Sequence, residues 1–240
     1  MLPNNEVFKM YDKWSKILSH TVLFKNIDID AINSLLQCLK PPIHQFRKNE
    51  YITIDGDPFT GIGIILLGEA TVVKENVAGN RVMVNLLKQG DIFGEMIAFS
   101  NRNTWPVSVN ASTDTTVIFL PPDKITGSCS TICFSHQELI LNMLNLVSNR
   151  GLLLNKRLEY LSLRSVREKI ATYFLEQYDK LEKPKFKLSM NRNELAEFLN
   201  VTRPSLSREL GKMRDEGLIN FERSSISLVD VDSLKEIILQ

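Results

Sequence analysis

The spacing of apolar residues changes twice along the chain, and each change marks a different kind of structure. In "DIDAINSLLQCL", apolar residues recur three and four positions apart from Ile29 to Leu39, which places them on one face of a helix. We expect helical structure from Glu6 to Leu39. Pro41 and Pro42 end it, because proline lacks the backbone N–H that a helix requires.

From Ile43 to about Leu120 the pattern shortens to strand-sized segments separated by turn residues. The stretch "IGIILLGEATVVKE" predicts two strands hinged at Gly68, and "NVAGNRVMVNLL" predicts a hairpin that turns at Gly79 and Asn80. "SVNASTDTTVIFLP" adds two more strands. Many short strands at even spacing predict a small barrel or roll.

A long amphipathic helix is predicted next. Its apolar positions alternate spacings of four and three: Ile140, Leu144, Val147, Gly151, Leu154, Leu158 and Leu161. So narrow a seam favours pairing with the same helix of a second copy, because a single small barrel rarely offers so long a groove. Packing of this helix on its own barrel is the alternative.

A second helix is predicted to begin after this one, in "LSLRSVREKI". Ser165 with Glu168 fits a capping box, so a new helix is expected from Val166 to Gln177. The hinge between the two helices is expected at Ser162 to Ser165. A charged linker, "DKLEKPK", and a short strand, "FKLSM", follow.

Two short helices and a hairpin are predicted beyond the strand. Asn191 with Glu194 makes a second capping box at the start of "RNELAEFLN". "VTRPSLSRELGKMRDEG" has Thr202 as its N-cap, Pro204 in its first turn and Gly217 at its end. "LINFERSSISLVD" reads as strand, turn and strand, which is a wing. Two short helices joined by "NV" and followed by a wing predict a winged helix-turn-helix.

The charge of the chain points to nucleic acid only in this last region. Apolar residues make up 43% of the 240 residues, charged residues make up 24%, and the formal net charge is +1. These values are ordinary for a globular protein and give no global attraction to DNA or membranes. Between residues 183 and 214, however, eight Lys and Arg face three acidic residues. We therefore expect the helix pair to bind DNA.

The second helix of the pair carries the chemistry for the major groove. Arginine can bond guanine O6 and N7 together, and serine hydroxyls adapt to either base or phosphate. The expected base-reading residues are Arg203, Ser205, Ser207 and Arg208. The expected phosphate contacts are Arg192, Thr202 and Lys212.

The order of these parts, with the motifs "GDIFGE" (Gly90 to Glu95) and "VTRPSLSREL" (Val201 to Leu210), resembles the CRP/FNR family of bacterial transcription regulators. The resemblance implies an α+β chain with three parts. These are a cyclic-nucleotide-binding-like β-roll with N-terminal helices (1–134), a long dimerisation helix and hinge (135–163), and a C-terminal winged helix-turn-helix (164–240). It also implies a homodimer on a palindromic DNA site, contact with RNA polymerase if the protein is an activator, and an effector bound in the roll.

The residues that bind cAMP in this family are mostly replaced. The Gly-Glu pair that lies at the family's pocket, with the glutamate on the ribose, matches Gly94 and Glu95. The Arg-Ser pair that holds the cyclic phosphate falls, counted without gaps, on Trp105 and Pro106. Aligned through "REKIA", the Thr-Ser pair that contacts adenine falls on Leu154 and Asn155. These six residues outline the expected effector pocket, and its chemistry predicts an effector other than cAMP.

The DNA-reading motif is retained in part. FNR-like members read DNA with a Glu, a Ser and an Arg; the last two match Ser207 and Arg208, while the Glu position is Pro204. CRP-like members share the arginine at Arg208 and another that matches Arg203. Proline cannot accept a bond from a cytosine amine, so the specificity beside Arg208 is expected to differ.

Redox and metal chemistry have few candidate residues. The N-terminus lacks the clustered cysteines of iron–sulfur members, and Cys129, Cys133 and His136 are too few ligands for a metal without help. Haem bound in the roll, with His44 as a poor ligand candidate, remains an alternative, which would make the protein a gas or redox sensor of the same architecture. We expect an unidentified small-molecule effector in preference to haem.

Other function classes find less support in the chain. No catalytic array or P-loop is visible, so an enzyme is not expected. A small-molecule binding module that does not act on DNA is the alternative from another class. The longest apolar run, Ile62 to Leu67, is strand-sized, which argues against a spanning helix or signal peptide and for a cytoplasmic protein without a membrane partner. The three cysteines, sparse and odd in number, suit a reducing compartment.

Overall fold

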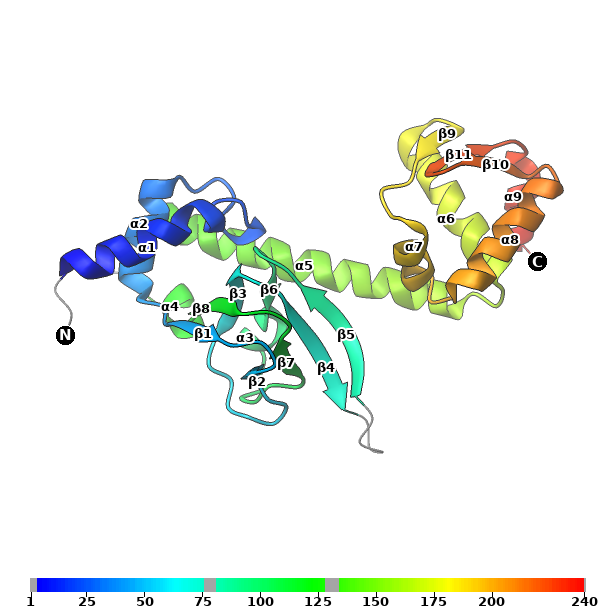
Figure 1. The fold of residues 1–240 in the computed structure, drawn as a ribbon. Helices are drawn as coiled ribbons and strands as arrows, with labels where there is room; N and C mark the ends of the chain where they lie inside the picture. Colours follow the sequence, from blue (N-terminus) through cyan, green and yellow to red (C-terminus); the bar gives the residue numbers. More distant parts are fainter. Residues whose placement is uncertain (1–3, 76–80, 128–133, 240) are drawn as a thin grey trace. The chain divides into compact units, whose positions relative to one another are not determined.

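A computed structural model of the chain describes residues 4–75, 81–127 and 134–239, which form two compact units. The units are Met1–Asn149 and Arg150–Gln240, so the division falls inside the long helix α5 (Phe134–Ser162). Figure 1 traces the element order of each unit. No helix in the described ranges is long and apolar enough to cross a membrane.

The first unit contains the predicted roll, built from two four-stranded antiparallel sheets. The first sheet has the order β1 (Ile43–Phe46), β8 (Thr115–Leu120), β3 (Ile62–Leu67) and β6 (Ile92–Phe93). The second has the order β2 (Tyr51–Thr53), β7 (Ser108–Ala111), β4 (Ala70–Glu75) and β5 (Arg81–Leu87). The expected pairing of β4 with β5 is confirmed, while the turn at Gly79 and Asn80 lies outside the described residues.

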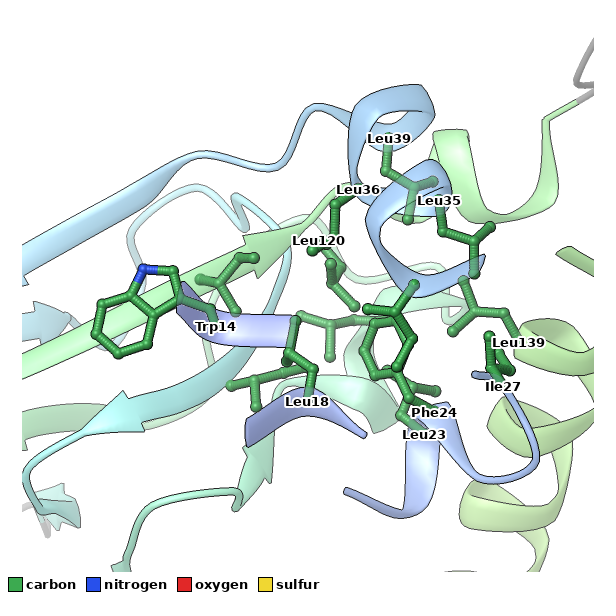
Figure 2. Packing of buried hydrophobic residues seen from close by; sticks show 14 of the residues in the cluster. Trp14, Leu18, Leu23, Phe24, Ile27, Leu35, Leu36, Leu39, Leu120 and Leu139 are labelled. Atoms are coloured by element: carbon green, nitrogen blue, oxygen red, sulfur yellow. The ribbon is translucent and has the colours of Figure 1, made fainter. Parts of the chain in front are cut away.

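Side chains of β8 alternate between two cores, as the period of a strand requires. Val117 and Phe119 pack with residues of the second sheet, whereas Ile118 and Leu120 pack with helices. The helical layer consists of α1 (Asn4–Leu18), the short 3-10 helix η1 (Val22–Phe24), α2 (Ile29–Leu39), α4 (Pro122–Thr126) and the start of α5. In Figure 2, Leu120 of β8 and Leu139 of α5 lie among the apolar side chains of α1, η1 and α2.

The N-terminal helical segment is broken where a continuous one was expected. Helix α1 ends at Leu18, and α2 begins only after Asp28, whose side chain accepts a hydrogen bond from the Ala31 N–H at 2.8 Å. The predicted end is confirmed: α2 stops at Leu39, and Lys40 takes a left-handed conformation before the two prolines.

The second unit holds the predicted winged helix-turn-helix. Its helices are α6 (Val166–Leu181), α7 (Arg192–Phe198), α8 (Arg203–Asp215) and α9 (Val231–Leu239). Its sheet has the order β10 (Ile219–Glu222), β11 (Ser225–Leu228) and β9 (Lys185–Lys187), so the wing pairs with the strand before α7.

Three details of this unit differ from the sequence-based expectation. Helix α6 continues through the first residues of the supposed linker to Leu181, because Tyr173, Phe174 and Leu175 anchor it in the core. Helix α9 was not expected, although Leu234 is fully buried. At the start of α6, Ser165 caps the Glu168 N–H, but the Glu168 carboxylate accepts from the Arg164 N–H and does not reach back to Ser165.

Candidate DNA-binding surface and effector pocket

Caps fix the two helices of the DNA-binding motif. The Asn191 side chain accepts hydrogen bonds from the Asn193 and Glu194 N–H groups, and the Glu194 carboxylate accepts from the Asn191 N–H at 2.8 Å. The predicted capping box is therefore confirmed. Thr202 accepts from the Ser205 N–H at 3.3 Å and begins α8, also as predicted.

Helix α8 divides into a buried face and an exposed face. Leu206, Leu210 and Met213 are buried in the core of the unit. Arg203, Ser207, Arg208 and Lys212 are exposed on the other side. Three of the four expected base-reading residues are thus free to contact a ligand. The fourth, Ser205, is half-buried, and its hydroxyl accepts a hydrogen bond from the Thr202 hydroxyl at 2.8 Å.

The expected phosphate contacts lie in different surroundings. Thr202 and Lys212 are exposed, and the Lys212 ammonium lies 4.0 Å from the Glu209 carboxylate. Arg192 is half-buried, and its guanidinium lies 5.2 Å from the ring centre of Phe221 on the wing strand β10. Burial lowers the pKa of Arg192, and its Nη1 atom is buried without a hydrogen-bond partner. Arg192 therefore joins the wing to α7 as well as contributing positive charge.

Two further residues of this unit escaped the sequence analysis. Gly211 is half-buried on α8, and a Cβ added there would meet no atom within 4 Å. A glycine in mid-helix costs stability relative to alanine. Arg167 of α6 donates from Nη1 and Nη2 to both carboxylate oxygens of Glu216, at 2.8 and 2.7 Å, and from Nε to Glu209 at 2.7 Å. Hydrogen bonding to Glu216 and Glu209 holds the pKa of Arg167 above its usual value.

The first unit brings Gly94 and Trp105 of the expected pocket into direct contact. Gly94 has φ +82° and caps the short helix α3 (Glu95–Ala98), and a Cβ at this position would lie 2.7 Å from the Trp105 ring. The indole is only 3% exposed and packs against Phe59 and Phe93, with ring centres 4.7 and 5.8 Å apart. Trp105 therefore fills the roll, and the half-buried Pro106 follows it.

Glu95, the residue after Gly94, lines a cavity of about 230 Å³ between α3, α4 and α5, which Trp105 does not line. The Glu95 side chain is 3% exposed. Of the six residues assigned to the effector pocket from the sequence, it alone lines this cavity. Leu154 and Asn155 are exposed on the part of α5 that belongs to the second unit, so their place in the pocket stays a prediction.

Candidate ligands for a metal or haem are scattered. No group of three or more His, Cys, Asp or Glu side chains suited to a metal ion occurs among the residues that the structure describes. Cys129 and Cys133 lie outside those residues, and His136 is buried. His44 is exposed on β1, with its ring 5.9 Å from that of Phe119. The haem alternative stays a prediction without a described site.

Comparisons with known proteins match both units. The family model of the cyclic nucleotide-binding domain matches residues 43–131, and that of the Crp-like helix-turn-helix domain matches residues 168–237. The matched residues include the two sheets of the roll and the elements from α7 to β11.

Similar proteins extend over most of the chain. The transcriptional activator protein anr of Pseudomonas aeruginosa is 21% identical over 208 residues, which is 85% of this chain and 81% of that protein. The global nitrogen regulator of a Nostoc species is 22% identical over 194 residues, 78% of this chain and 85% of that protein. The catabolite activator protein of Thermus thermophilus has a similar fold, with a TM-score of 0.52 and 20% identity over 91% of this chain and 99% of that chain.

Proposed function

The chain belongs to the CRP/FNR family of bacterial transcription regulators, and from that membership we propose that it is a homodimeric, sequence-specific DNA-binding regulator controlled by an effector other than cAMP. The exposed face of α8 is the single observation that carries the proposal. It presents Arg203, Ser207 and Arg208 together, on a helix capped at its start and backed by the core of the unit.

The roles of these side chains follow from their exposure and chemistry. Arg208 and Arg203 read guanines, since a guanidinium forms two parallel bonds to O6 and N7. Ser207 adapts to either base, and Ser205 acts mainly through the cap that it shares with Thr202. Lys212, Thr202 and Arg192 supply contacts to the phosphates on either side.

The identity of the effector is constrained by Trp105. A cyclic phosphate needs a charge-assisted contact, which an arginine gives and an indole does not. The indole is also packed between Phe59 and Phe93, so it cannot move aside without opening the core of the roll. The proposed regulator therefore senses something other than a cyclic nucleotide at this position.

The proposed assembly is a two-fold dimer, paired through α5, on a palindromic site. Leu154, Leu158 and Leu161 keep about half of their surface exposed in the single chain, at 47, 60 and 49%. Such a row of leucines favours pairing with a second copy. In this proposal the protein works in the cytoplasm, where the chromosome lies, and contacts RNA polymerase if it is an activator.

The test begins by selecting a specific duplex from random DNA with the wild-type protein, followed by gel-shift titrations. Arg208→Ala is expected to lose about 1–3 kcal/mol of binding free energy on the selected duplex and little on random DNA. Lys212→Ala, a matched change on the same helix, is expected to weaken both duplexes alike and to reduce the salt dependence.

Two results contradict the proposal. If wild-type protein selects no sequence and binds no duplex, the chain is a small-molecule binding module and not a DNA-binding regulator. If Arg208→Ala weakens selected and random duplexes equally, Arg208 contacts phosphate and the base-reading role belongs to other residues.

A further inference from the structure

The cavity beside Glu95 is formed by three helices of the first unit. Helix α3 contributes Glu95 and Met96, with Phe99 and Ser100 just beyond its end, and α4 contributes Ile125 and Thr126. Helix α5 forms the opposite wall with Ile140, Met143, Leu144 and Val147. These four recur at helical spacing, so one face of α5 closes the cavity.

The cavity has a buried floor and an exposed apolar rim. Glu95, Ile125 and Met143 at the floor are 3, 1 and 3% exposed. At the rim, Met96, Phe99 and Leu144 keep 47, 48 and 59% of their surface exposed. Large apolar side chains around an opening are a feature of ligand and partner sites, and methionines adapt their shape to what binds.

Size and chemistry define the occupant. A cavity of about 230 Å³ is smaller than the usual site of a drug-sized ligand. An engineered apolar cavity of about 150 Å³ holds benzene, so this one suits roughly six to twelve non-hydrogen atoms. The lining disfavours an anion, because the described residues that form it include no basic side chain to pair with a negative charge. A hydroxyl or N–H on the ligand can donate to the Glu95 carboxylate.

We infer that this cavity is the effector site, and that its ligand is a small, uncharged, mainly apolar molecule with one hydrogen-bond donor. The inference rests on the proposed regulatory function and names the chemical class of its effector. It also explains how the family's nucleotide pocket can be filled by Trp105 without loss of sensing. The proposed sensing site is lined by Glu95 and Met96 of α3, whereas the indole packs against Gly94 at the start of that helix.

The same face of α5 gives the ligand a route to regulation. Ile140, Leu144 and Val147 line the cavity and lie on the same helix as Leu154, Leu158 and Leu161, which are proposed to pair two copies. A ligand that fills the cavity shifts this face, so ligand binding and helix pairing become linked equilibria. The coupling is reciprocal: a ligand that favours the paired helix binds the dimer more tightly than the monomer.

The test uses the full chain with naphthol as the uncharged probe and naphthoate as its anionic counterpart. Naphthol is expected to bind and to raise the melting temperature, while naphthoate and cAMP leave it unchanged. Met96→Trp and Thr126→Trp fill the cavity from α3 and α4 and are each expected to weaken naphthol binding about tenfold or more. Val22→Trp, at a residue that is 58% exposed outside the cavity, is the matched control and is expected to bind like wild type.

Glu95→Gln separates charge from shape. It replaces the carboxyl group by an amide of the same size that can donate to a carboxylate, so naphthoate binding is expected to appear while naphthol binding remains. Absence of naphthol binding by the wild-type protein overturns the inference. So does naphthol binding that Met96→Trp and Thr126→Trp leave intact. If those two changes alter dimer dissociation and not naphthol affinity, the occupant is a second copy. DNA binding is measured on the same preparations, and its absence contradicts the proposed function independently of the probe result.

Discussion

The backbone of Gly94 and the indole of Trp105 approach so closely that any side chain at position 94 would collide with the ring. Gly94 also takes a positive φ of 82°, which other residues adopt only with strain. One residue type thus satisfies two requirements at the start of α3. The consequence is local and chemical: a buried, uncharged aromatic cluster occupies the space beside the start of α3.

A second glycine offers a sharper test at the scale of one residue. Gly211→Ala is expected to raise the free energy of unfolding by roughly 0.5–1 kcal/mol, because alanine is the better helix former and its methyl group meets no neighbour within 4 Å. If DNA lies against this face of α8, the methyl group occupies space that the bases or backbone need. DNA affinity is then expected to fall although the protein becomes more stable.

Chemical denaturation and gel shifts on one preparation measure both effects. Gly211→Ser adds a side chain at the same position with a lower helix propensity than alanine, so it separates the loss of space from the gain in stability. A more stable Gly211→Ala protein with undiminished DNA affinity would show that DNA does not approach this part of α8.

Single side chains were predictable from the sequence where local pattern decided their place. The exposure of Arg203, Ser207 and Arg208 follows from helical periodicity around buried leucines. The stacking of Arg192 on Phe221 does not, because the two residues meet only through the fold of the wing onto α7. Nor could the split between Trp105 in the core and Glu95 at the cavity be predicted, since the two lie ten positions apart with no shared period.

At the scale of elements, Arg167 fastens α8 to α6. Its guanidinium bonds both oxygens of Glu216 near the end of α8 and one oxygen of Glu209, the residue after the proposed base-reading Arg208. A planar, bidentate arginine–carboxylate pair fixes the relative orientation of the two side chains as well as their distance. Arg167 therefore acts as a positioning residue for α8, the helix that is proposed to contact DNA.

This pairing predicts a pH dependence of stability. Hydrogen bonding to Arg167 holds the pKa of Glu216 below its usual value. A carboxyl group with a lowered pKa in the folded state stabilises the fold above its unfolded pKa and loses that effect as the pH falls through the folded value. Wild type is therefore expected to melt at a higher temperature than Glu216→Gln at neutral pH. The difference is expected to shrink below about pH 4.3, where an ordinary glutamate is protonated.

Thermal melts across that range check the expectation. Glu222→Gln makes the same chemical change on the exposed strand β10, where Glu222 has no ion pair within the described part of the chain, and is expected to melt like wild type at every pH. A difference between wild type and Glu216→Gln that persists unchanged into strong acid would assign the effect to something other than the ion pair.

Elements with caps or turn residues at their ends were predicted well, and elements that tertiary contacts extend were not. Asn191, Thr202 and Gly217 mark α7 and α8 in the sequence as they do in the structure. The sequence pattern predicts too early an end for α6, because the charged residues after Gln177 resemble a linker. In the structure, the aromatic residues before them hold the helix in the core. The gap between α1 and α2 was missed because apolar residues continue through it as η1, where Leu23 and Phe24 are fully buried.

At the scale of the whole molecule, α5 contributes to both compact units and carries the residues proposed to join two copies. Its early part is held by its own unit: Leu139 and Met143 are buried, and Ile140 and Val147 pack partly against the same core. Part of the repeat predicted as a dimer seam therefore serves the protomer itself, as the alternative interpretation of the sequence allowed. Farther along, the leucines of the repeat remain exposed.

That division decides how the dimer should be tested. Leu154→Glu with Leu158→Glu places charges on side chains that are 47 and 60% exposed, so the protomer is expected to keep its fold. Two copies paired through this face would bury like charges against each other, so sedimentation velocity is expected to find monomers. Affinity for a palindromic duplex should then fall by about 10²- to 10⁴-fold, because the second half-site no longer binds intramolecularly. Affinity for a single half-site is expected to stay the same.

The matched control is Leu152→Glu with Leu153→Glu, which adds the same charge at residues 66 and 46% exposed on other sides of the helix. A dimer that survives the first pair of changes and dissociates with the second would place the interface on that other side of α5.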